Sequence, residues 1–311
     1  MRTVFMGTPG FAVPVLVALL DAGHEVAGVY TQPDRPVGRR RQPAPSPVKE
    51  AALERGLPVF QPPSLKRAEA QDELAGLAPD VIVVAAYGLF LPRATLDLPP
   101  LGCLNVHPSL LPKYRGPSPV ASAILSGDAD TGVTVIKLDE GMDSGPIIAQ
   151  CETPIGADED GVGLTARLFQ LGADLMVETL PEWAAGHIVA VPQDDAAATT
   201  TKLLKREDGE IDWGQDTARI ARQVRAYQPW PGAFTRWRGK LLKLTEATEA
   251  ADHALDAQPG QVIALPSGGL GVATAHGTLD VKRLQLEGSR ASDAAEFLRG
   301  HADIVGAVLG E

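Results

Sequence analysis

The feature that most limits how this chain can fold is a nearly continuous apolar run at residues 79–86, PDVIVVAA. The run is rich in β-branched residues and lacks the alternating polar positions of a strand that has one face in water. Such runs are typical of strands that lie inside a parallel sheet and are covered by helices on both faces. The sequence therefore predicts an α/β fold.

Strand and helix patterns alternate on both sides of this run. The alternation predicts a doubly wound, mostly parallel sheet, a Rossmann-like arrangement that we expect to fill a first domain at residues 1–188. The other expected strands are Thr3–Met6, His24–Tyr30, Cys103–His107 and Gly132–Leu138, and the expected helices include Phe11–Ala22, Ser46–Arg55 and Pro117–Ser126.

The pattern changes after Trp183. Residues 189–203 contain several alanines and threonines without helical periodicity, so we expect a linker there. Between residues 204 and 311, short apolar runs such as LLKLTEA, GQVIAL and LDVKRLQL recur with glycines at the turns. This spacing indicates a small antiparallel β-barrel, similar to an OB fold, as a second domain.

Several classes of protein lack support in the sequence. The two cysteines, Cys103 and Cys151, belong to no CxxC or Cys/His cluster, so we expect neither a disulfide framework nor a metal site. No stretch of about 18 apolar residues could span a membrane, and the N-terminal residues do not form a signal peptide. We therefore expect a cytoplasmic protein with no membrane association and no obligate protein partner.

The first turn, Gly7-Thr8-Pro9-Gly10, occupies the place of a dinucleotide-binding loop but does not match its glycine pattern. Pro9 has no N–H to offer a pyrophosphate. A tight turn between strand and helix explains both glycines. These residues disfavour a nicotinamide-dependent oxidoreductase.

Charge is unevenly distributed along the chain. The 28 basic residues are outnumbered by 39 acidic ones, and a net charge of −11 argues on average against a nucleic-acid partner. Residues 202–245 are the exception, because they carry 10 basic and 5 acidic side chains. This basic block predicts either a local face that binds a polyanion or a solvated surface, and charge alone leaves both open.

Polar residues gather where two predicted strands end. Asn105 and His107 lie at the carboxyl end of one strand and, because side chains alternate, on the same face of it. Asp143 follows the next strand and has a glycine two residues away on each side. An amide donor, an imidazole and a carboxylate suit acyl transfer. The residues alone do not exclude that His107 has a structural role, or that Asp143 and Asp139 serve only to form a turn.

Two segments around these residues, NVHPSLLPKYRGPSP and LDEGMDSGPI, resemble the active-site signatures of the folate-dependent formyltransferases. The resemblance implies that Asn105, His107 and Asp143 are catalytic. In the second half, GEIDW, QPWPGAF, GQVI and LQLEGSR with EFLRG are similar to the members of that family that formylate methionyl initiator tRNA. The resemblance covers nearly the whole chain.

The resemblance further implies a reaction and its partners. The formyl group of 10-formyltetrahydrofolate would pass to the α-amine of methionine on charged initiator tRNA, with no metal. The folate would bind between backbone near Tyr87–Leu91 and backbone near Ile136–Asp139, and Phe11 would contribute to a methionine pocket. The folate-binding residues implied are Tyr87, Gly88, Phe90, Leu91, Ser109, Leu110, Leu111, Pro112 and Asp139.

Contacts to tRNA are expected in two places. Arg39, Arg40 and Arg41 lie in a proline-rich segment at residues 33–47, which we expect to be mobile without tRNA; a solvated connector is the alternative. The second place is the basic block, with Lys205, Arg206, Arg236 and Arg238.

Two other functions stay open. One is formylation of a small amine such as an amino sugar nucleotide. The other is noncatalytic nucleic-acid binding, which leaves the three convergent polar residues unexplained.

Overall fold

The computed structural model describes residues 1–37, 42–250 and 257–310. The chain forms two compact units. The first consists of Met1–Pro119, Asp130–Pro154 and Thr165–Thr201, and the second of Val120–Ala129, Ile155–Leu164 and Lys202–Glu311. The domain boundaries expected near residues 188 and 203 stay a prediction.

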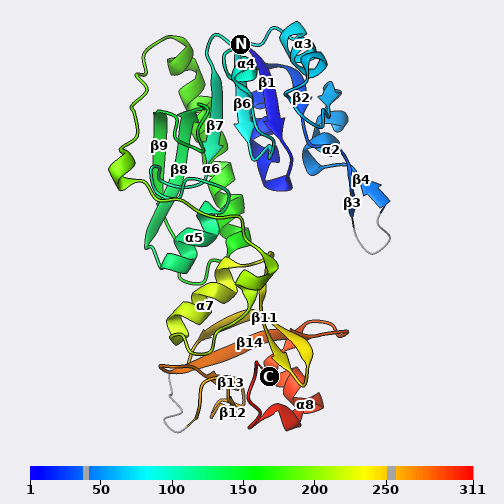
Figure 1. Ribbon diagram of the computed structural model, residues 1–311, viewed down its shortest axis with the longest axis vertical. Helices are drawn as coiled ribbons and strands as arrows, with labels where there is room; N and C mark the ends of the chain where they lie inside the picture. The colour runs from blue at the N-terminus through cyan, green and yellow to red at the C-terminus, as the bar shows by residue number, and fades with distance from the viewer. Residues whose placement is uncertain (38–41, 251–256, 311) are drawn as a thin grey trace. The chain divides into compact units, whose positions relative to one another are not determined.

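The first unit is built on a seven-stranded sheet with the strand order β5-β2-β1-β6-β7-β8-β9, and most of these strands follow one another across the upper part of Figure 1. The strands from β5 to β7 are parallel, whereas β8 and β9 are antiparallel to their neighbours. The mostly parallel, Rossmann-like sheet is confirmed. Its strands are β1 (Arg2–Gly7), β2 (Glu25–Tyr30), β5 (Val59–Phe60), β6 (Val81–Ala85), β7 (Cys103–His107), β8 (Asp130–Lys137) and β9 (Ile147–Pro154).

All five residues of β6 are buried, as its unbroken apolar sequence predicts. Ser46 caps the helix α2 (Pro47–Glu54), since its side chain accepts a hydrogen bond from the backbone N–H of Lys49. The remaining helices up to residue 201 are η1 (Gly10–Ala12), α1 (Val13–Asp21), α3 (Ala68–Gly76), α4 (Arg93–Leu96), α5 (Pro119–Ser126), α6 (Gly161–Ala184) and η2 (Asp195–Ala197), and a hairpin pairs β3 (Arg35–Val37) with β4 (Gln42–Ala44).

Close packing fixes β7, the strand that carries Asn105 and His107. Gly172 of α6 lies so near that strand that an added Cβ would come within 2.4 Å of the Val106 side chain. A larger residue would push α6 away from the sheet, and interiors at this density tolerate little added volume. The face of β7 opposite to Asn105 and His107 is therefore held tightly.

The direction of β8 corrects one expectation. Lys137, at the carboxyl end of β8, pairs with Leu104 near the start of β7. Asp143 follows β8 as expected, but the carboxyl ends of β7 and β8 lie at opposite edges of the sheet, so the expectation that these two strand ends meet is wrong. A buried strand has the same apolar pattern whether it runs parallel or antiparallel to its neighbour. The sequence therefore did not show the direction of β8 relative to β7.

The second unit contains an antiparallel half-barrel with the order β10-β11-β14-β13-β12, in which β15 also pairs with β14. The expected antiparallel β fold is confirmed. Its elements are η3 (Arg206–Gly209), α7 (Thr217–Ala226), β10 (Ala233–Trp237), β11 (Lys240–Glu249), β12 (Val262–Ala264), β13 (Leu270–Ala273), β14 (Thr278–Leu286), β15 (Ser292–Asp293), α8 (Ala294–Gly300) and η4 (Ala302–Ile304).

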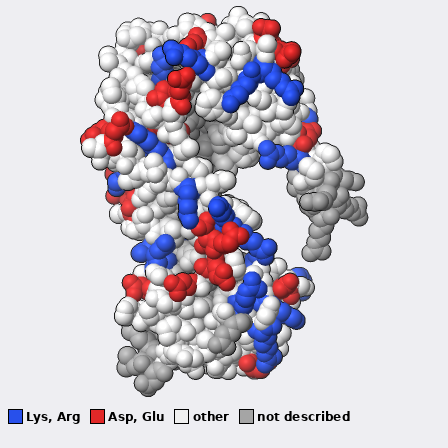
Figure 2. Space-filling view, viewed as in Figure 1, with Lys and Arg blue, Asp and Glu red and all other residues white. Residues whose placement is uncertain are grey.

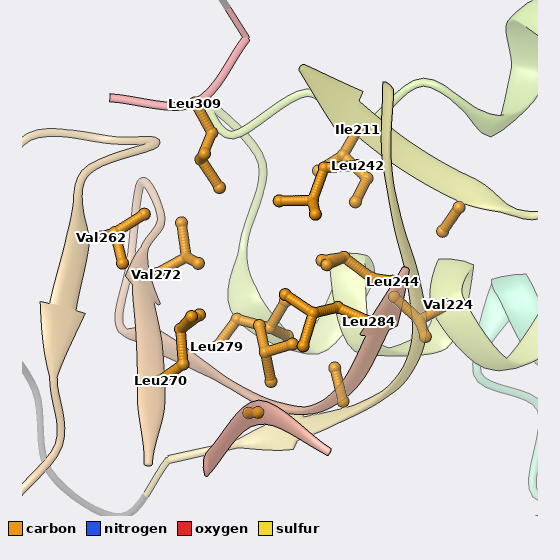
Figure 3. Close-up of a cluster of buried hydrophobic side chains, with 14 of the residues drawn as sticks. Ile211, Val224, Leu242, Leu244, Val262, Leu270, Val272, Leu279, Leu284 and Leu309 are labelled. Atoms are coloured by element: carbon orange, nitrogen blue, oxygen red, sulfur yellow. The ribbon is translucent and has the colours of Figure 1, made fainter. Parts of the chain in front are cut away.

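Side chains from these strands and from α7 form one hydrophobic core, part of which Figure 3 shows. On β11, Leu242 and Leu244 point inward while Lys243 is exposed, which is the alternation of a strand with one face in water. Leu284 of β14 is fully buried in the same cluster. The half-barrel thus has a core of its own.

We expect Leu284→Ala to destabilise the second unit by about 2–5 kcal/mol, because the truncation leaves a cavity in a close-packed core. Leu203, which is 71% exposed, provides the matched control, and Leu203→Ala should change the free energy of unfolding by less than about 0.5 kcal/mol. Urea denaturation of the full chain measures both. Equal effects of the two substitutions would contradict the assignment of Leu284 to the core.

Candidate active site

Asn105 and His107 share one face of β7 because side chains alternate along a strand. Asn105 is half-buried, and His107 is 4% exposed. In register, Asn105 lies between Val84 of β6 and Ile136 of β8. No hydrogen bond to the Asn105 side chain occurs within residues 1–37, 42–250 and 257–310, so its amide group can donate to a bound molecule.

Both ring nitrogens of His107 face oxygen atoms. Nε2 lies 3.1 Å from the Tyr114 carbonyl oxygen, and Nδ1 lies 3.6 Å from Oδ2 of Asp143. A carbonyl oxygen only accepts, so Nε2 carries a hydrogen and donates it. In the neutral ring Nδ1 then has a free lone pair that points toward the carboxylate. Nδ1 is thus the nitrogen that can take up a proton, and Asp143 stabilises the imidazolium that results.

Burial is the strongest influence on the charge of His107. Removal of the ring from water lowers the pKa of His107, while the Asp143 carboxylate and the Tyr114 carbonyl each raise it by a smaller amount. The net direction is downward, so the neutral imidazole is favoured near neutral pH. A neutral ring beside a carboxylate is ready to accept a proton.

Asp143 reaches His107 from the loop between β8 and β9. Its Oδ2 accepts a hydrogen bond of 2.8 Å from the backbone N–H of Gly116. Its backbone has φ of 52°, in the left-handed region that residues other than glycine rarely adopt. Gly145 allows the loop to fold tightly, since a Cβ there would lie 1.9 Å from the Lys137 carbonyl oxygen. The convergence of Asp143 with His107 therefore depends on loop geometry.

Side chains of β8 and β9 hold the loop after His107 in place by hydrogen bonds. Ser109 Oγ donates to the Lys113 carbonyl oxygen, closing the loop on itself. Thr134 Oγ1 donates to the Ser109 carbonyl oxygen and accepts from the backbone N–H of Leu111. Gln150 donates to the Leu111 carbonyl oxygen and to Thr134. Thr134 and Gln150 were not among the predicted site residues. A polar residue within the buried apolar run of β8 was the available signal for Thr134, and β9 offered no comparable signal for Gln150.

Tyr87 and Leu91 are buried, whereas Phe90 is 60% exposed and lies under the Lys66 ammonium group. Gly88 has φ of 78°, and the carbonyl oxygen of Tyr87 accepts hydrogen bonds from Thr8 and Gln32.

The carboxylate of Asp139 accepts from Ser144 Oγ and from the Gly141 N–H. Asp139 therefore stabilises its own loop, in accordance with the turn role that the sequence left open.

The expected substrate-binding residues are distributed over both units. Phe11 is 37% exposed and packs on Phe169, with 4.7 Å between ring centroids. Figure 2 shows Lys and Arg side chains along one side of the second unit. In this unit Lys205, Arg206 and Arg236 are exposed, and Arg238 stacks over Trp237 and pairs with Asp303. The predictions for Arg39, Arg40 and Arg41 fall outside the described residues.

The turn at Gly7-Thr8-Pro9-Gly10 is used structurally. Thr8 Oγ1 donates to the Tyr87 carbonyl oxygen and accepts from the Gln32 N–H, joining the ends of three strands.

Across the described ranges, no group of three or more His, Cys, Asp or Glu side chains is arranged to hold a metal ion. None of the helices described is long and apolar enough to cross a bilayer.

Comparison with known proteins decides the family. A family profile described as "Formyl transferase" matches residues 1–180, and a second, "Formyl transferase, C-terminal domain", matches residues 203–302. The chain belongs to the formyl transferase family. It is therefore a transferase enzyme, and the resemblance to the formyltransferases is confirmed.

Relatives of this formyl transferase extend over almost its full length. The methionyl-tRNA formyltransferase of Roseiflexus castenholzii is 52% identical over 96% of this chain and 96% of its own. That of Chloroflexus aggregans is 50% identical over 96% of this chain and 97% of its own.

Solved structures show the same fold at low identity. HypX from Aquifex aeolicus in complex with tetrahydrofolic acid has a TM-score of 0.66 and 20% identity, covering 98% of this chain and 48% of its own. Methionyl-tRNA formyltransferase from Clostridium thermocellum has a TM-score of 0.56 and 18% identity, covering 80% of this chain and 94% of its own.

The geometry around His107 predicts how its pKa responds to Asp143. The carboxylate raises the pKa of His107 against the effect of burial, so Asp143→Asn should lower that pKa further. Titration of the His107 ring by NMR, in the wild-type protein and in the variant, measures the shift. An unchanged or higher pKa in the Asn variant would show that the carboxylate does not face the ring in solution.

Proposed function

We propose that this formyl transferase moves the formyl group of 10-formyltetrahydrofolate to the α-amine of methionine esterified to initiator tRNA. The convergence of Asn105, His107 and Asp143 at β7 is the observation that carries the proposal. Near-full-length identity to relatives named methionyl-tRNA formyltransferase supports the choice of substrate. The free thiols Cys103 and Cys151 suit a reducing compartment, and we place the reaction in the cytoplasm.

The reaction needs a group that stabilises negative charge on the formyl oxygen. When the amine nitrogen attacks the formyl carbon, a tetrahedral intermediate with an oxyanion forms. The uncommitted amide of Asn105 is a donor for this oxyanion, and loss of one such donor typically lowers turnover about 100- to 1,000-fold. Asn105 is held on a strand, so little reorganisation is needed as the charge develops.

The reaction also needs a proton to move. The attacking amine loses one proton, and the folate nitrogen that leaves gains one when its bond to the formyl carbon breaks. Nδ1 of His107, the ring nitrogen with the free lone pair, would accept the first proton and return it, directly or through water, to the leaving nitrogen. Asp143 stabilises the charged ring between these two steps.

We assign the folate to the surface of the loop after His107 and to the backbone near Tyr87–Leu91 and Ile136–Asp139. Ser109, Leu110, Leu111 and Pro112 form the loop that β8 and β9 hold in place. Phe90, exposed beside this region, offers an aromatic surface. Because the loop is fixed by hydrogen bonds, the bound folate would keep its formyl carbon near Asn105 and His107.

We assign tRNA contacts to the second unit and to the arginines of residues 33–47. Lys205, Arg206, Arg236 and Lys243 are exposed on the second unit in a protein that is otherwise acidic. Exposed lysines and arginines bind phosphates and release counterions, so binding weakens as salt rises. In the first unit, Phe11 would pack against the methionine side chain.

The substrate is tested by offering formyl-labelled 10-formyltetrahydrofolate with charged initiator tRNA, charged elongator tRNA, free methionine and an amino sugar nucleotide. We expect label to appear on charged initiator tRNA with a kcat/KM far above that of the other amines. Preferential labelling of the amino sugar nucleotide would favour the small-amine alternative, and no labelling of any amine would overturn the proposal.

Substitution of Asn105, His107 or Asp143 by Ala should each lower turnover at least about 100-fold while the Kd for folate changes little. Because the three side chains act on one intermediate, a double substitution should cost little more than the worse single one. Single-turnover kinetics and equilibrium folate binding measure these effects. Near-normal turnover of a single variant would remove that residue from the mechanism.

Arg236→Ala tests the contribution of the second unit. We expect a lower kcat/KM for charged initiator tRNA and a shallower dependence on salt concentration, because one phosphate contact is lost. Arg290→Ala removes an equal charge from an exposed position outside the basic block and is the matched control. Identical salt slopes for wild type and Arg236→Ala would show that Arg236 meets no phosphate.

A further inference from the structure

The segment at residues 191–201, expected from its composition to lie within a linker, is bonded to the loops that carry the candidate active site. Ile147 and Val191 exchange two backbone hydrogen bonds of 2.8 Å. Arg115 donates its backbone N–H to the Thr199 carbonyl oxygen and accepts from the N–H of Thr201. These contacts form a short extension beside both catalytic loops, which we call the strap.

Gln193 is the strap residue that touches the Asp143 loop. Its Nε2 donates to the carbonyl oxygens of Asp143 and Gly145, at 2.8 Å and 2.7 Å. Its Oε1 accepts from Nε of Arg115 at 2.9 Å. Both amide hydrogens and the amide oxygen are therefore used, and the side chain has one orientation that satisfies all three contacts.

Arg115 fixes Gln193 from the other side. It belongs to the loop that follows His107, and its side chain is 11% exposed. Its guanidinium donates to Gln193 through Nε and to Asp195 through a second nitrogen at 2.8 Å. The planar guanidinium holds two strap residues at a fixed spacing. The loop of His107 and the loop of Asp143 are thus joined through Gln193.

The backbone at Asp143 needs such support. Its φ of 52° lies in the left-handed region, which is less favourable for Asp than for glycine. The Gly116 N–H holds the carboxylate, but a side chain alone does not fix the backbone that carries it. Gln193 binds the carbonyl oxygens of Asp143 and of Gly145, on both sides of Ser144. These bonds keep the carboxylate facing Nδ1 of His107.

We propose that Gln193, held by Arg115, is a positioning residue that keeps Asp143 in place for formyl transfer. This inference rests on the function proposed above. Gln193 lies too far along the chain from the active-site signatures to belong to either, and it acts through the backbone of Asp143. The strap also continues directly into residue 202, where the second unit begins.

Two substitutions separate the contacts of Gln193. Gln193→Ala removes all three hydrogen bonds. Gln193→Glu keeps an acceptor for Arg115 but supplies no donor for the two carbonyl oxygens, and it places a carboxylate against them. Both variants should therefore release the Asp143 loop. Gln170→Ala, which removes an exposed glutamine of α6 bonded to Asp174, is the matched control.

The kinetic test compares kcat with KM. A displacement of about 1 Å in a catalytic group can lower the rate about 100-fold. We expect kcat to fall about 10- to 100-fold in Gln193→Ala and Gln193→Glu, with KM for folate within about twofold of the wild-type value, and Gln170→Ala to retain wild-type kinetics. A rise in KM without a fall in kcat would overturn the positioning role.

The second readout does not depend on turnover. Among the described residues, the polar groups in contact with the His107 ring are the Tyr114 carbonyl and the Asp143 carboxylate, of which the carboxylate is charged. Release of Asp143 should lower the pKa of His107 toward its value in Asp143→Asn, as measured by NMR. A wild-type pKa in both Gln193 variants, with the fold intact by circular dichroism, would refute the inference. Inactivity of the wild-type protein toward charged tRNA would instead refute the proposed function and leave the pKa test valid.

Discussion

The burial of His107 at the carboxyl end of β7 is the constraint on which the rest of the site depends. A charged imidazole withdrawn from water loses several kcal/mol of hydration, so burial lowers the pKa of His107 and favours the neutral ring. The Tyr114 carbonyl occupies one ring nitrogen and Asp143 faces the other. In the proposed mechanism, proton transfer by His107 depends on the position of this carboxylate, which the surrounding loops hold.

Much of this architecture could be predicted from the sequence. The bounds of β7 were predicted as observed, and Ser46 caps α2 as its position before Pro47 indicated. Asn105 and His107 share a face because strand alternation depends on local geometry alone. The three polar side chains could thus be identified as a group from the sequence, and the motifs that surround them indicated the family.

The remaining features depend on contacts between distant residues. The antiparallel direction of β8 cannot be deduced from its apolar run, and therefore the carboxyl ends of β7 and β8 were wrongly expected to meet. Gln193 lies in a segment whose alanines and threonines are typical of a linker, yet its side chain bonds two residues about fifty positions earlier in the chain. Local patterns carry no signal for such a contact, because the contact forms only when both loops are in place.

In the proposed mechanism Asn105 and His107 act on the formyl group during transfer, and Asp143 stabilises the charged His107 ring. A crystal structure of the protein with an unreactive analogue of 10-formyltetrahydrofolate tests it most directly. We expect the oxygen corresponding to the formyl oxygen to lie about 3 Å from the amide nitrogen of Asn105, with the His107 ring beside the reacting carbon and its Nδ1 still facing Asp143. An analogue bound in full occupancy away from β7, with these three side chains untouched, would contradict the account.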